Sequence, residues 1–378
     1  MADDRRRHRI RFSRLKTEAP VTIWLWGLSD ACQRCSGPET GVKYVRMMNF
    51  RFSYSFFPLP GLLVLMAVLL ATGFRPGQAT AESITVNATR VEFNPEDPGK
   101  RILGSLRYRG GLHLRSGAPG FGGLSALGVS SDGRRLIALS DRGQRFSARL
   151  VYDENGDLAG LRQTELDSLA GLDGFPLSSK ADGDAESMSP GVEGEIIVAF
   201  ERRHRLWRYL PGVTVPVPLP GPVELSAMPS NNGIEALTLL ADGSLLALSE
   251  GQRGQGDSVG WISDVNGWSV LTYDAGKLYQ VTGAATLPGG DVIVLERFYT
   301  PRGHSNIRLK RIDQNTIKAG ARLSGKILAE IRPPYTVDNF EGVDARRGRN
   351  GEVFVYLVSD DNFNPDQRTL LMMFELME

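Results

Sequence analysis

The strongest constraint on this 378-residue chain is a pair of short phrases that recurs along it. The first phrase carries a central Glu or Ser beside small and apolar residues, and the second is an apolar run that ends in an acid. The clearest copy is Gly233-Ile234-Glu235-Ala236-Leu237 followed by Leu246-Ala247-Leu248-Ser249-Glu250. The central positions of the first phrase are 125, 186, 235, 285 and 341, and alanine replaces the acid at 285. Five copies at intervals of 49 to 61 residues predict repetition of one structural unit.

Tight turns separate the two phrases and predict a hairpin in each copy. Ser131-Asp132-Gly133, Ala241-Asp242-Gly243 and Arg349-Asn350-Gly351 supply the positive φ angles that such turns require. Strand repeats of this length are typical of a β-propeller, in which neighbouring blades bury one another's faces. The apolar run at 369–376 belongs to no copy, and we expect it to pair with the early strand at 102–108. The predicted fold is therefore an all-β, six-bladed β-propeller whose last blade is closed by N- and C-terminal strands, with a two-sheet sandwich or two β domains as the alternative.

Three segments are predicted along the chain. Residues 1–46 are basic and irregular, and we expect a disordered or untranslated extension. Residues 47–81 resemble a secretory signal peptide, with an apolar core at 61–71 and the small-residue cleavage site Ala79-Thr80-Ala81. Residues 82–378 then form the propeller, periplasmic or secreted after cleavage and without a membrane span. An uncleaved signal acting as an inner-membrane anchor is the alternative.

Composition limits the function classes that this chain can serve. Residues 1–81 contain twelve of the 44 Lys and Arg residues and five of the 43 Asp and Glu residues, so the remainder is net acidic. An acidic body argues against a nucleic-acid surface, which needs a basic face. Both cysteines lie in Cys32-Gln33-Arg34-Cys35, half of a metal or redox motif, so the propeller has no disulfide. No strand follows the Gly-rich stretch 251–260 in P-loop order, and we expect no organic cofactor.

Several phrases resemble a known family when they are taken together. They are Gly122-Gly123-Leu124-Ser125, Ser140-Asp141-Arg142-Gly143, Asp184-Ala185-Glu186, Phe200-Glu201-Arg202-Arg203-His204-Arg205, Asn232-Gly233-Ile234-Glu235-Ala236-Leu237, Asn339-Phe340-Glu341-Gly342 and Ser359-Asp360-Asp361-Asn362-Phe363-Asn364-Pro365-Asp366-Gln367-Arg368-Thr369-Leu370-Leu371. Across residues 100–378 this pattern resembles the exported bacterial proteins named for the esterase-like activity of phytase. The resemblance implies a propeller and suggests hydrolysis of phosphate or carboxylate esters, but it assigns no catalytic residue.

The acids of the repeated phrases are the candidate site. Equivalent strand ends of a propeller meet around one axis, so these side chains are expected to form a ring at one mouth of the channel. The candidate metal ligands are Glu186, Glu201, Glu235, Glu250, Glu341 and Asp360, and Asp141 and Glu296 occupy similar positions. Oxygen ligands in this number suit Ca²⁺ or Mg²⁺. The alternative is structural, because acids at strand ends also accept hydrogen bonds from neighbouring backbone amides.

Cationic residues near these acids are the candidate substrate ligands. They are Arg142, Arg202, Arg297 and His304. Arginine grips phosphate or carboxylate oxygens through paired hydrogen bonds. The sequence therefore predicts a metal-dependent hydrolase acting on an anionic small-molecule ester, active as a monomer. A non-catalytic propeller that binds a ligand or protein in the cell envelope, and a lactonase-like metal-dependent propeller, are the alternatives, because the fold alone does not choose among them.

Overall fold

The computed structural model describes residues 81–191, 193–251, 256–300 and 305–377. The predicted N-terminal extension (1–46) lies outside these residues, as do all of the predicted signal peptide except Ala81 and the predicted substrate ligand His304. Within the part that is described, no helix is both long enough and apolar enough to cross a membrane.

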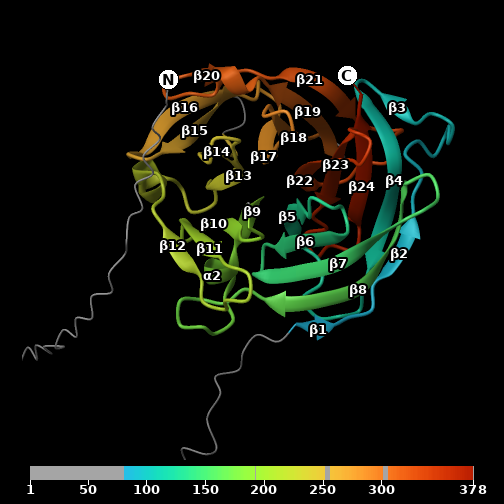
Figure 1. Cartoon of the computed structure of the whole chain (residues 1–378), viewed down its shortest axis with the longest axis horizontal. Coiled ribbons are helices and arrows are strands. Elements are labelled where there is room, and N and C mark those ends of the chain that lie inside the picture. The colour runs from blue at the N-terminus through green and yellow to red at the C-terminus, as the bar shows by residue number, and fades with distance from the viewer. Residues whose placement is uncertain (1–80, 192, 252–255, 301–304, 378) are drawn as a thin grey trace, which may run out of the picture. The chain divides into compact units, whose positions relative to one another are not determined.

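Five antiparallel blades surround a common axis (Figure 1). Each blade runs outward from an inner strand, and the inner strands β5, β9, β13, β17 and β22 lie next to one another around the axis. Blade 1 contains β5 (Leu124–Val129), β6 (Arg135–Ser140), β7 (Gln144–Tyr152), β8 (Leu158–Ser168) and β1 (Glu82–Ser83). Blade 2 contains β9 (Ala185–Pro190), β10 (Ile196–Phe200), β11 (Arg205–Tyr209) and β12 (Val217–Leu219). Blade 3 contains β13 (Ile234–Leu239), β14 (Leu245–Ser249), β15 (Asp257–Asp264), β16 (Gly267–Asp274) and β20 (Arg322–Leu323), which joins β16 in parallel.

The last two blades complete the ring. Blade 4 contains β17 (Gln280–Thr286), β18 (Val292–Tyr299), β19 (Ser305–Ile312) and β21 (Lys326–Ile331). Blade 5 contains β22 (Phe340–Arg347), β23 (Val353–Ser359), β24 (Thr369–Leu376), β4 (Leu106–Arg115) and β2 (Asn87–Arg90), with β3 (Ile102–Leu103) beside β4. The described helical segments are short: α2 (Lys180–Gly183), η1 (Val223–Ala227) and η2 (Gln314–Thr316).

The β-propeller prediction is confirmed, but the predicted number of six blades is wrong. The apolar run at the C-terminus is β24, the third strand of the unit that β22 and β23 begin, rather than the start of another unit. It pairs antiparallel with β4, from Thr369 opposite Leu114 to Leu376 opposite Leu106. The five copies of the phrases therefore correspond to five blades, and the strands from the two chain ends complete the fifth blade instead of forming a sixth.

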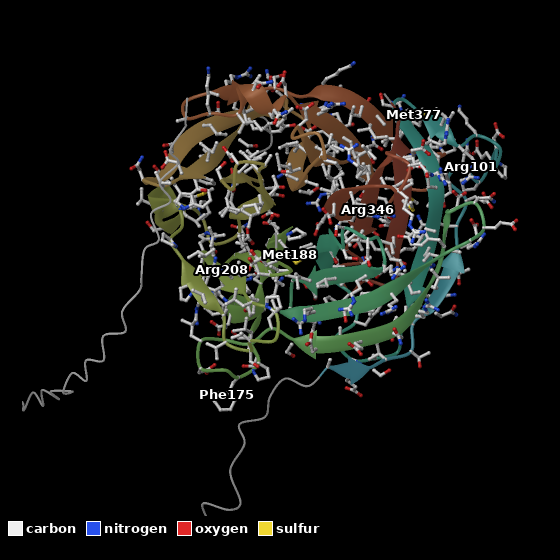
Figure 2. The ribbon with its side chains drawn as sticks, in the orientation of Figure 1. Arg101, Phe175, Met188, Arg208, Arg346 and Met377 are labelled. Carbon is white, nitrogen blue, oxygen red and sulfur yellow. The ribbon has the colours of Figure 1, made fainter. Side chains whose placement is uncertain are left out.

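Five apolar cores fill the five seams between neighbouring blades. The seam between blades 4 and 5, for example, packs Ile293 and Leu309 against Leu357 and Phe374. Each of the other four seams has a comparable cluster. Figure 2 shows side chains filling the spaces between the ribbons, with Met188 close to the axis. Because every blade has both faces covered, strands such as β10 and β14 are buried along their whole length.

The predicted hairpin turns have the expected geometry. Gly133 and Gly243 adopt φ angles of +71° and +87°, and the preceding Asp132 and Asp242 accept hydrogen bonds from backbone N–H groups two residues on. These turns join an inner strand to the second strand of its blade. They therefore bring the start of the inner strand and the end of the second strand to the same end of the axis.

Candidate functional site

Every inner strand carries one extra residue at the same place. In each blade a β-bulge leaves a single inner-strand residue without a partner on the second strand. The five bulge residues are Ser125, Glu186, Glu235, Thr282 and Glu341. All of them except Glu186 line a narrow cavity on the axis. The bulge therefore presents one side chain from each blade at one end of the propeller.

The fourth blade differs from the sequence-based alignment. Its bulge residue is Thr282, three positions before Ala285, which the alignment of the phrases had placed there. A second correction follows on the neighbouring strand. On the second strand of each blade, one residue pairs with the inner-strand residue just before the bulge. The residue that follows it is an acid in four blades, namely Asp141, Glu201, Glu250 and Asp360, and it is Arg297 in blade 4. Arg297 thus occupies the position that is acidic in the other blades.

Glu296 does not belong to the ring of acids. It is fully buried on the opposite face of β18, where the Tyr273 hydroxyl donates to it over 2.7 Å. Arg308 donates a further hydrogen bond, and Lys310 Nζ lies 3.1 Å from Glu296 Oε1. This carboxylate is therefore neutralised inside blade 4 and is not available to a ligand on the axis.

Three carboxylates of blade 2 converge on one point. Asp184 precedes β9, Glu186 is the bulge residue of β9, and Glu201 follows β10. One oxygen of each lies within 4.8 Å of the others. The Glu201 N–H donates to the Asp184 carbonyl over 2.8 Å, which fixes the two segments against each other. We call these residues the blade 2 triad.

Two of the other ring acids, Glu250 and Glu341, contact an arginine. Arg297 donates hydrogen bonds to Glu341 and, over 2.5 Å, to Asn339 Oδ1. Its Nη2 lies 3.6 Å from Glu250 Oε1. The Asn339 side-chain amide also donates to Glu341, over 3.0 Å. Asp360 Oδ1 accepts from the Asn362 N–H over 2.6 Å. Arg297 therefore balances part of the negative charge of blades 3 to 5.

Burial and mutual repulsion raise the pKa values of several of these acids. Burial, followed by the neighbouring carboxylates, raises the pKa of Glu186 and of Glu235 well above the ordinary value of 4.5. The same two causes raise the pKa of Asp360 to about 8. Burial also raises the pKa of Glu201, although the hydrogen bond from the Gly233 N–H opposes this. The cluster is therefore short of positive charge, which protons or a cation must supply.

The donor set fits a hard divalent cation. All three atoms of the blade 2 triad are carboxylate oxygens, the ligands that Ca²⁺ and Mg²⁺ prefer. Asp184 is buried, with 1% of its side chain exposed, and its Oδ2 has no hydrogen-bond partner. Arg202 Nε lies 2.6 Å from this atom, but the pair lacks hydrogen-bond geometry, so we treat it as an ion pair. Glu186 and Glu235 keep some exposed surface, which leaves them reachable from solvent.

A sequence model of the family described as "Esterase-like activity of phytase" matches residues 119–363. The chain belongs to this phytase-like family. The match covers about two thirds of the chain and includes the blade 2 triad and the five bulges. No curated protein matches the sequence.

Solved structures with a similar course of the chain are distant in sequence. A protein of unknown function from Dyadobacter fermentans is 12% identical with a TM-score of 0.37, covering 79% of this chain and 94% of that one. A catalytically inactive virginiamycin B lyase from Staphylococcus aureus is 11% identical with a TM-score of 0.35, covering 76% and 99%. The WD40 domain of Neurospora crassa Pan2 is 12% identical with a TM-score of 0.36, covering 69% and 92%. Similarity at this level carries no information about the chemistry of the phytase-like chain.

The predicted substrate ligands occupy different surroundings. Arg202 touches the blade 2 triad, and Arg297 lies within the ring. Arg142 is exposed, and its guanidinium stacks 3.5 Å from the centre of the Phe363 ring. His304 lies outside the described residues. The structure thus brings Arg202 and Arg297 to the acids and places Arg142 at the rim.

Three further residues near the triad were not among the predicted site residues. Asp184 begins a less strict copy of the repeated phrase, two residues before Glu186, and Lys180 lies on the short helix α2, which no repeat predicts. His204 Nε2 lies 2.9 Å from the Pro229 carbonyl, whereas its Nδ1 is buried without a partner. A Cβ atom added to Gly233 would lie 3.0 Å from both this nitrogen and the Glu201 side chain, so His204 and Glu201 are neighbours. Only the acid at 184, in the phrase Asp184-Ala185-Glu186, offered a sequence signal.

The axis is closed beneath the ring of acids. Small and apolar residues, including Ala126, Met188, Gly283 and Gly342, fill the channel and leave about 10 Å³ for the centre of a water molecule. The inner strands come this close because their central residues are small. A Cβ at Gly283 would lie 2.5 Å from the Glu341 carbonyl oxygen. A ligand can therefore reach the acids from the mouth but cannot pass through the propeller.

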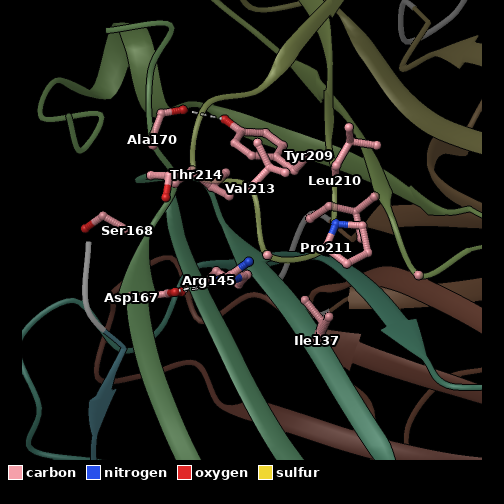
Figure 3. A pocket seen from close by; sticks show the side chains of 14 residues that line it. Ile137, Arg145, Asp167, Ser168, Ala170, Tyr209, Leu210, Pro211, Val213 and Thr214 are labelled. Atoms are coloured by element: carbon pink, nitrogen blue, oxygen red, sulfur yellow. Dashed lines mark hydrogen bonds and ion pairs between the residues drawn. The ribbon is translucent and has the colours of Figure 1, made fainter. Parts of the chain in front are cut away.

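A separate cleft lies between blades 1 and 2 (Figure 3). Arg145 and Asp167 form a two-pronged ion pair on one of its walls, and the Tyr209 hydroxyl donates to the Ala170 carbonyl over 2.9 Å. The remaining wall is largely apolar, with Ile137 and Val213. Because the charged groups drawn in this cleft already satisfy one another, the ring of acids is the better candidate for chemistry.

Proposed function

We propose that this phytase-like propeller is an exported hydrolase of phosphate or carboxylate esters that uses a divalent cation, Ca²⁺ or Mg²⁺, at the mouth of its channel. The observation that carries the proposal is the blade 2 triad, in which three buried or half-buried carboxylate oxygens lie within 4.8 Å of one another. Family membership supports hydrolysis of an ester. The high pKa values of Glu186 and Glu235 support a cation, since one would relieve the repulsion that raises them.

The residues around the triad divide the work in this proposal. Asp184, Glu186 and Glu201 hold the cation, and Glu235, Glu250, Glu341 and Asp360 extend the negative ring toward it. A bound cation polarises a phosphoryl or carbonyl oxygen and lowers the pKa of a water molecule. Arg202 and Arg142 have exposed guanidinium groups that can bind an anionic substrate. Arg297 is already engaged by Glu341 and Asn339, so its contribution is to hold the ring in place.

The compartment is part of the same proposal. A cleaved signal peptide at 47–81 would leave a mature chain of residues 82–378 in the periplasm or outside the cell. Mass spectrometry of the exported protein should find Glu82 at its N-terminus. An N-terminus upstream of residue 61 in a membrane fraction would favour the uncleaved anchor instead.

Cation binding and turnover test the enzymatic proposal together. We expect Ca²⁺ or Mg²⁺ to bind the purified chain in a calorimetric titration and to support hydrolysis of p-nitrophenyl phosphate or p-nitrophenyl acetate that a chelator abolishes. Glu186→Gln should weaken cation binding by about tenfold or more, in the range seen for metal-site substitutions. Glu154→Gln is the matched control, because Glu154 is exposed on the hairpin tip between β7 and β8.

Two results would redirect the proposal. Binding of the cation without turnover on phosphate, carboxylate and lactone esters would identify a non-catalytic ligand-binding propeller. Turnover on lactones alone would favour the lactonase-like alternative. Equal cation affinity in Glu186→Gln and Glu154→Gln would remove the triad as the site.

A further inference from the structure

Two cationic side chains, Lys180 and Arg202, pair with Asp184, the most buried acid of the triad. Lys180 Nζ donates to Asp184 Oδ1, and Arg202 Nε lies 2.6 Å from Asp184 Oδ2. The side chain of Asp184 is 1% exposed, so the two cations are its main contacts with the mouth of the channel. Both oxygens that a metal would use on Asp184 are therefore covered by positive charge in this structure.

Both cationic side chains are accessible from solvent, and Lys180 has a second partner. The side chain of Lys180 is 40% exposed and that of Arg202 is 44% exposed. Lys180 Nζ also donates to Asp141 Oδ2 over 2.6 Å and to the Asp141 carbonyl over 3.0 Å, so it keeps a partner if it leaves Asp184. Lys180 can therefore leave Asp184 and keep a partner, and Arg202 can turn toward solvent without being buried.

The backbone around Arg202 is unusual. Arg202 has a φ angle of +54°, a left-handed conformation that non-glycine residues seldom adopt. The Arg202 N–H donates to the Ser230 carbonyl over 2.9 Å, and this bond to the connection that precedes β13 holds the conformation. Unfavourable backbone conformations that persist tend to be found at functional sites. This one directs the Arg202 side chain at the triad.

We propose that Lys180 and Arg202 form an exchangeable anion site that binds a phosphate ester when a divalent cation takes Asp184. This inference rests on the proposed function, because it requires the cation at the triad. With a divalent cation bound to Asp184, Lys180 and Arg202 would turn away from this carboxylate and present their positive charge to the mouth. A carboxylate ester carries no charge at its reacting group, whereas a phosphate monoester carries up to two negative charges. The arrangement therefore selects phosphate monoesters.

The exchange makes the two ligands cooperative. A cation frees Lys180 and Arg202 for the anion, and an anion that holds them removes the competitors of the cation. By thermodynamic linkage each ligand must raise the affinity of the other by the same factor. Removing either side chain should have opposite effects on the two ligands, which no purely structural role predicts.

Calorimetric titration of the full chain with Ca²⁺, with and without methylphosphonate, tests the exchange. In the wild type we expect methylphosphonate to raise Ca²⁺ affinity by about fivefold or more. In Lys180→Gln and Arg202→Gln, Ca²⁺ alone should bind more tightly than in the wild type, and the gain from methylphosphonate should fall below about twofold. Lys180→Arg keeps the charge and should keep the coupling.

Arg203→Gln is the matched control. Arg203 lies in the same loop, is more exposed, and pairs with Asp182 rather than with the triad. It should behave as the wild type does. Circular dichroism before each titration shows whether a variant is folded, and Arg202→Gln provides the test if Lys180→Gln is not.

The outcomes separate this inference from the proposed function. If the wild type binds Ca²⁺ and hydrolyses esters but methylphosphonate leaves Ca²⁺ affinity unchanged, the exchange is wrong and the hydrolase stands. The exchange is equally wrong if Lys180→Gln and Arg202→Gln bind Ca²⁺ more weakly than the wild type. If the wild type binds no divalent cation, both fail together.

Discussion

At the scale of the residue, one departure from the repeat, Arg297 in place of an acid, balances part of the negative charge at the mouth. Four blades place an acid directly after the second strand, and blade 4 has Arg297 at the equivalent position of β18. This guanidinium, with 12% of its side chain exposed, contacts Glu250 of blade 3 and Asn339 and Glu341 at the inner strand of blade 5. A ring of acids alone would repel itself, so a single buried cation allows carboxylates from separate blades to stay close.

Arg297→Met should therefore be severely destabilising. Removing one partner of a buried ion pair leaves an uncompensated charge, which typically costs about 3 kcal/mol or more. We expect urea unfolding to show a loss of this size in the free energy of unfolding. Arg203→Met removes an exposed arginine and should change stability by less than about 0.5 kcal/mol. Similar losses in both variants would mean that Arg297 has no special part in holding the ring.

At the scale of the element, side chains near the end of the inner strands that lies away from the acids join neighbouring blades at three of the five seams. Ser189 accepts from the Leu239 N–H over 2.8 Å, and Thr238 accepts from the Thr286 N–H over 3.0 Å. Asp344 accepts from the Val129 N–H over 2.6 Å and so joins blade 5 to blade 1.

The two remaining seams do not need this bond. At the seam between blades 1 and 2, Pro190 occupies the position of the donor, and proline has no backbone N–H that needs an acceptor. In blade 5 the Ala345 N–H donates to Asp344 itself, over 2.8 Å. A repeated hydrogen bond is thus omitted only where its donor is absent or already satisfied.

Asp344 makes the closing seam sensitive to pH. Burial raises its pKa to about 7, against the lowering effect of the hydrogen bonds from Val129 and Ala345. Because the folded state binds this proton more tightly than the unfolded chain, the stabilisation is complete below about pH 4 and is lost as the pH rises through 7. Relative to Asp344→Asn, we expect the free energy of unfolding of the wild type to fall by an amount on the order of 4 kcal/mol across that range. Parallel stability curves for the two proteins would show that Asp344 is not buried as an acid.

The close approach of the inner strands gives a second prediction at this scale. The Cβ of Gly283→Ala would lie 2.5 Å from the Glu341 carbonyl oxygen and 3.1 Å from Val343 Cγ1. Backbone atoms cannot move aside as a flexible side chain can, so we expect a loss of about 1–3 kcal/mol in thermal or urea unfolding. Gly289→Ala has nothing within 4 Å of its new methyl group and should stay within about 1 kcal/mol of the wild type. An unchanged Gly283→Ala protein would mean that the strands are farther apart than the structure has them.

At the scale of the whole molecule, the sequence was sufficient to predict a propeller, but not the number of its blades or the register of its inner strands. Hairpin turns and buried strands recur strongly enough to predict a propeller and the pairing of its two ends. The predicted number of blades was wrong because of Thr369–Leu376, since nothing in the sequence of an apolar strand indicates which repeat it belongs to. The predicted ring acids do gather at one mouth, except Glu296.

The site was harder to predict because a β-bulge shifts register by one residue. Side chains alternate between faces along a strand, so a single added residue reverses which face each one takes. Gly283-Ala284-Ala285 imitates the repeated phrase, and only the pairing identifies Thr282 as the bulge residue. The same pairing separates Glu296 from Arg297. Asp184 begins a less strict copy of the repeated phrase but does not occupy its central position, and Lys180 lies in the connection before β9, where no periodic pattern marks it.

The central claim is that carboxylates of blade 2 hold a divalent cation at the mouth of the propeller. Anomalous diffraction from crystals grown with Mn²⁺, which accepts the same oxygen ligands, tests it most directly. We predict an anomalous peak about 2.0–2.6 Å from carboxylate oxygens of Asp184, Glu186 and Glu201, with Lys180 and Arg202 turned away from Asp184. The absence of an anomalous peak at the mouth of the channel, with Lys180 and Arg202 still paired with Asp184, would contradict the account.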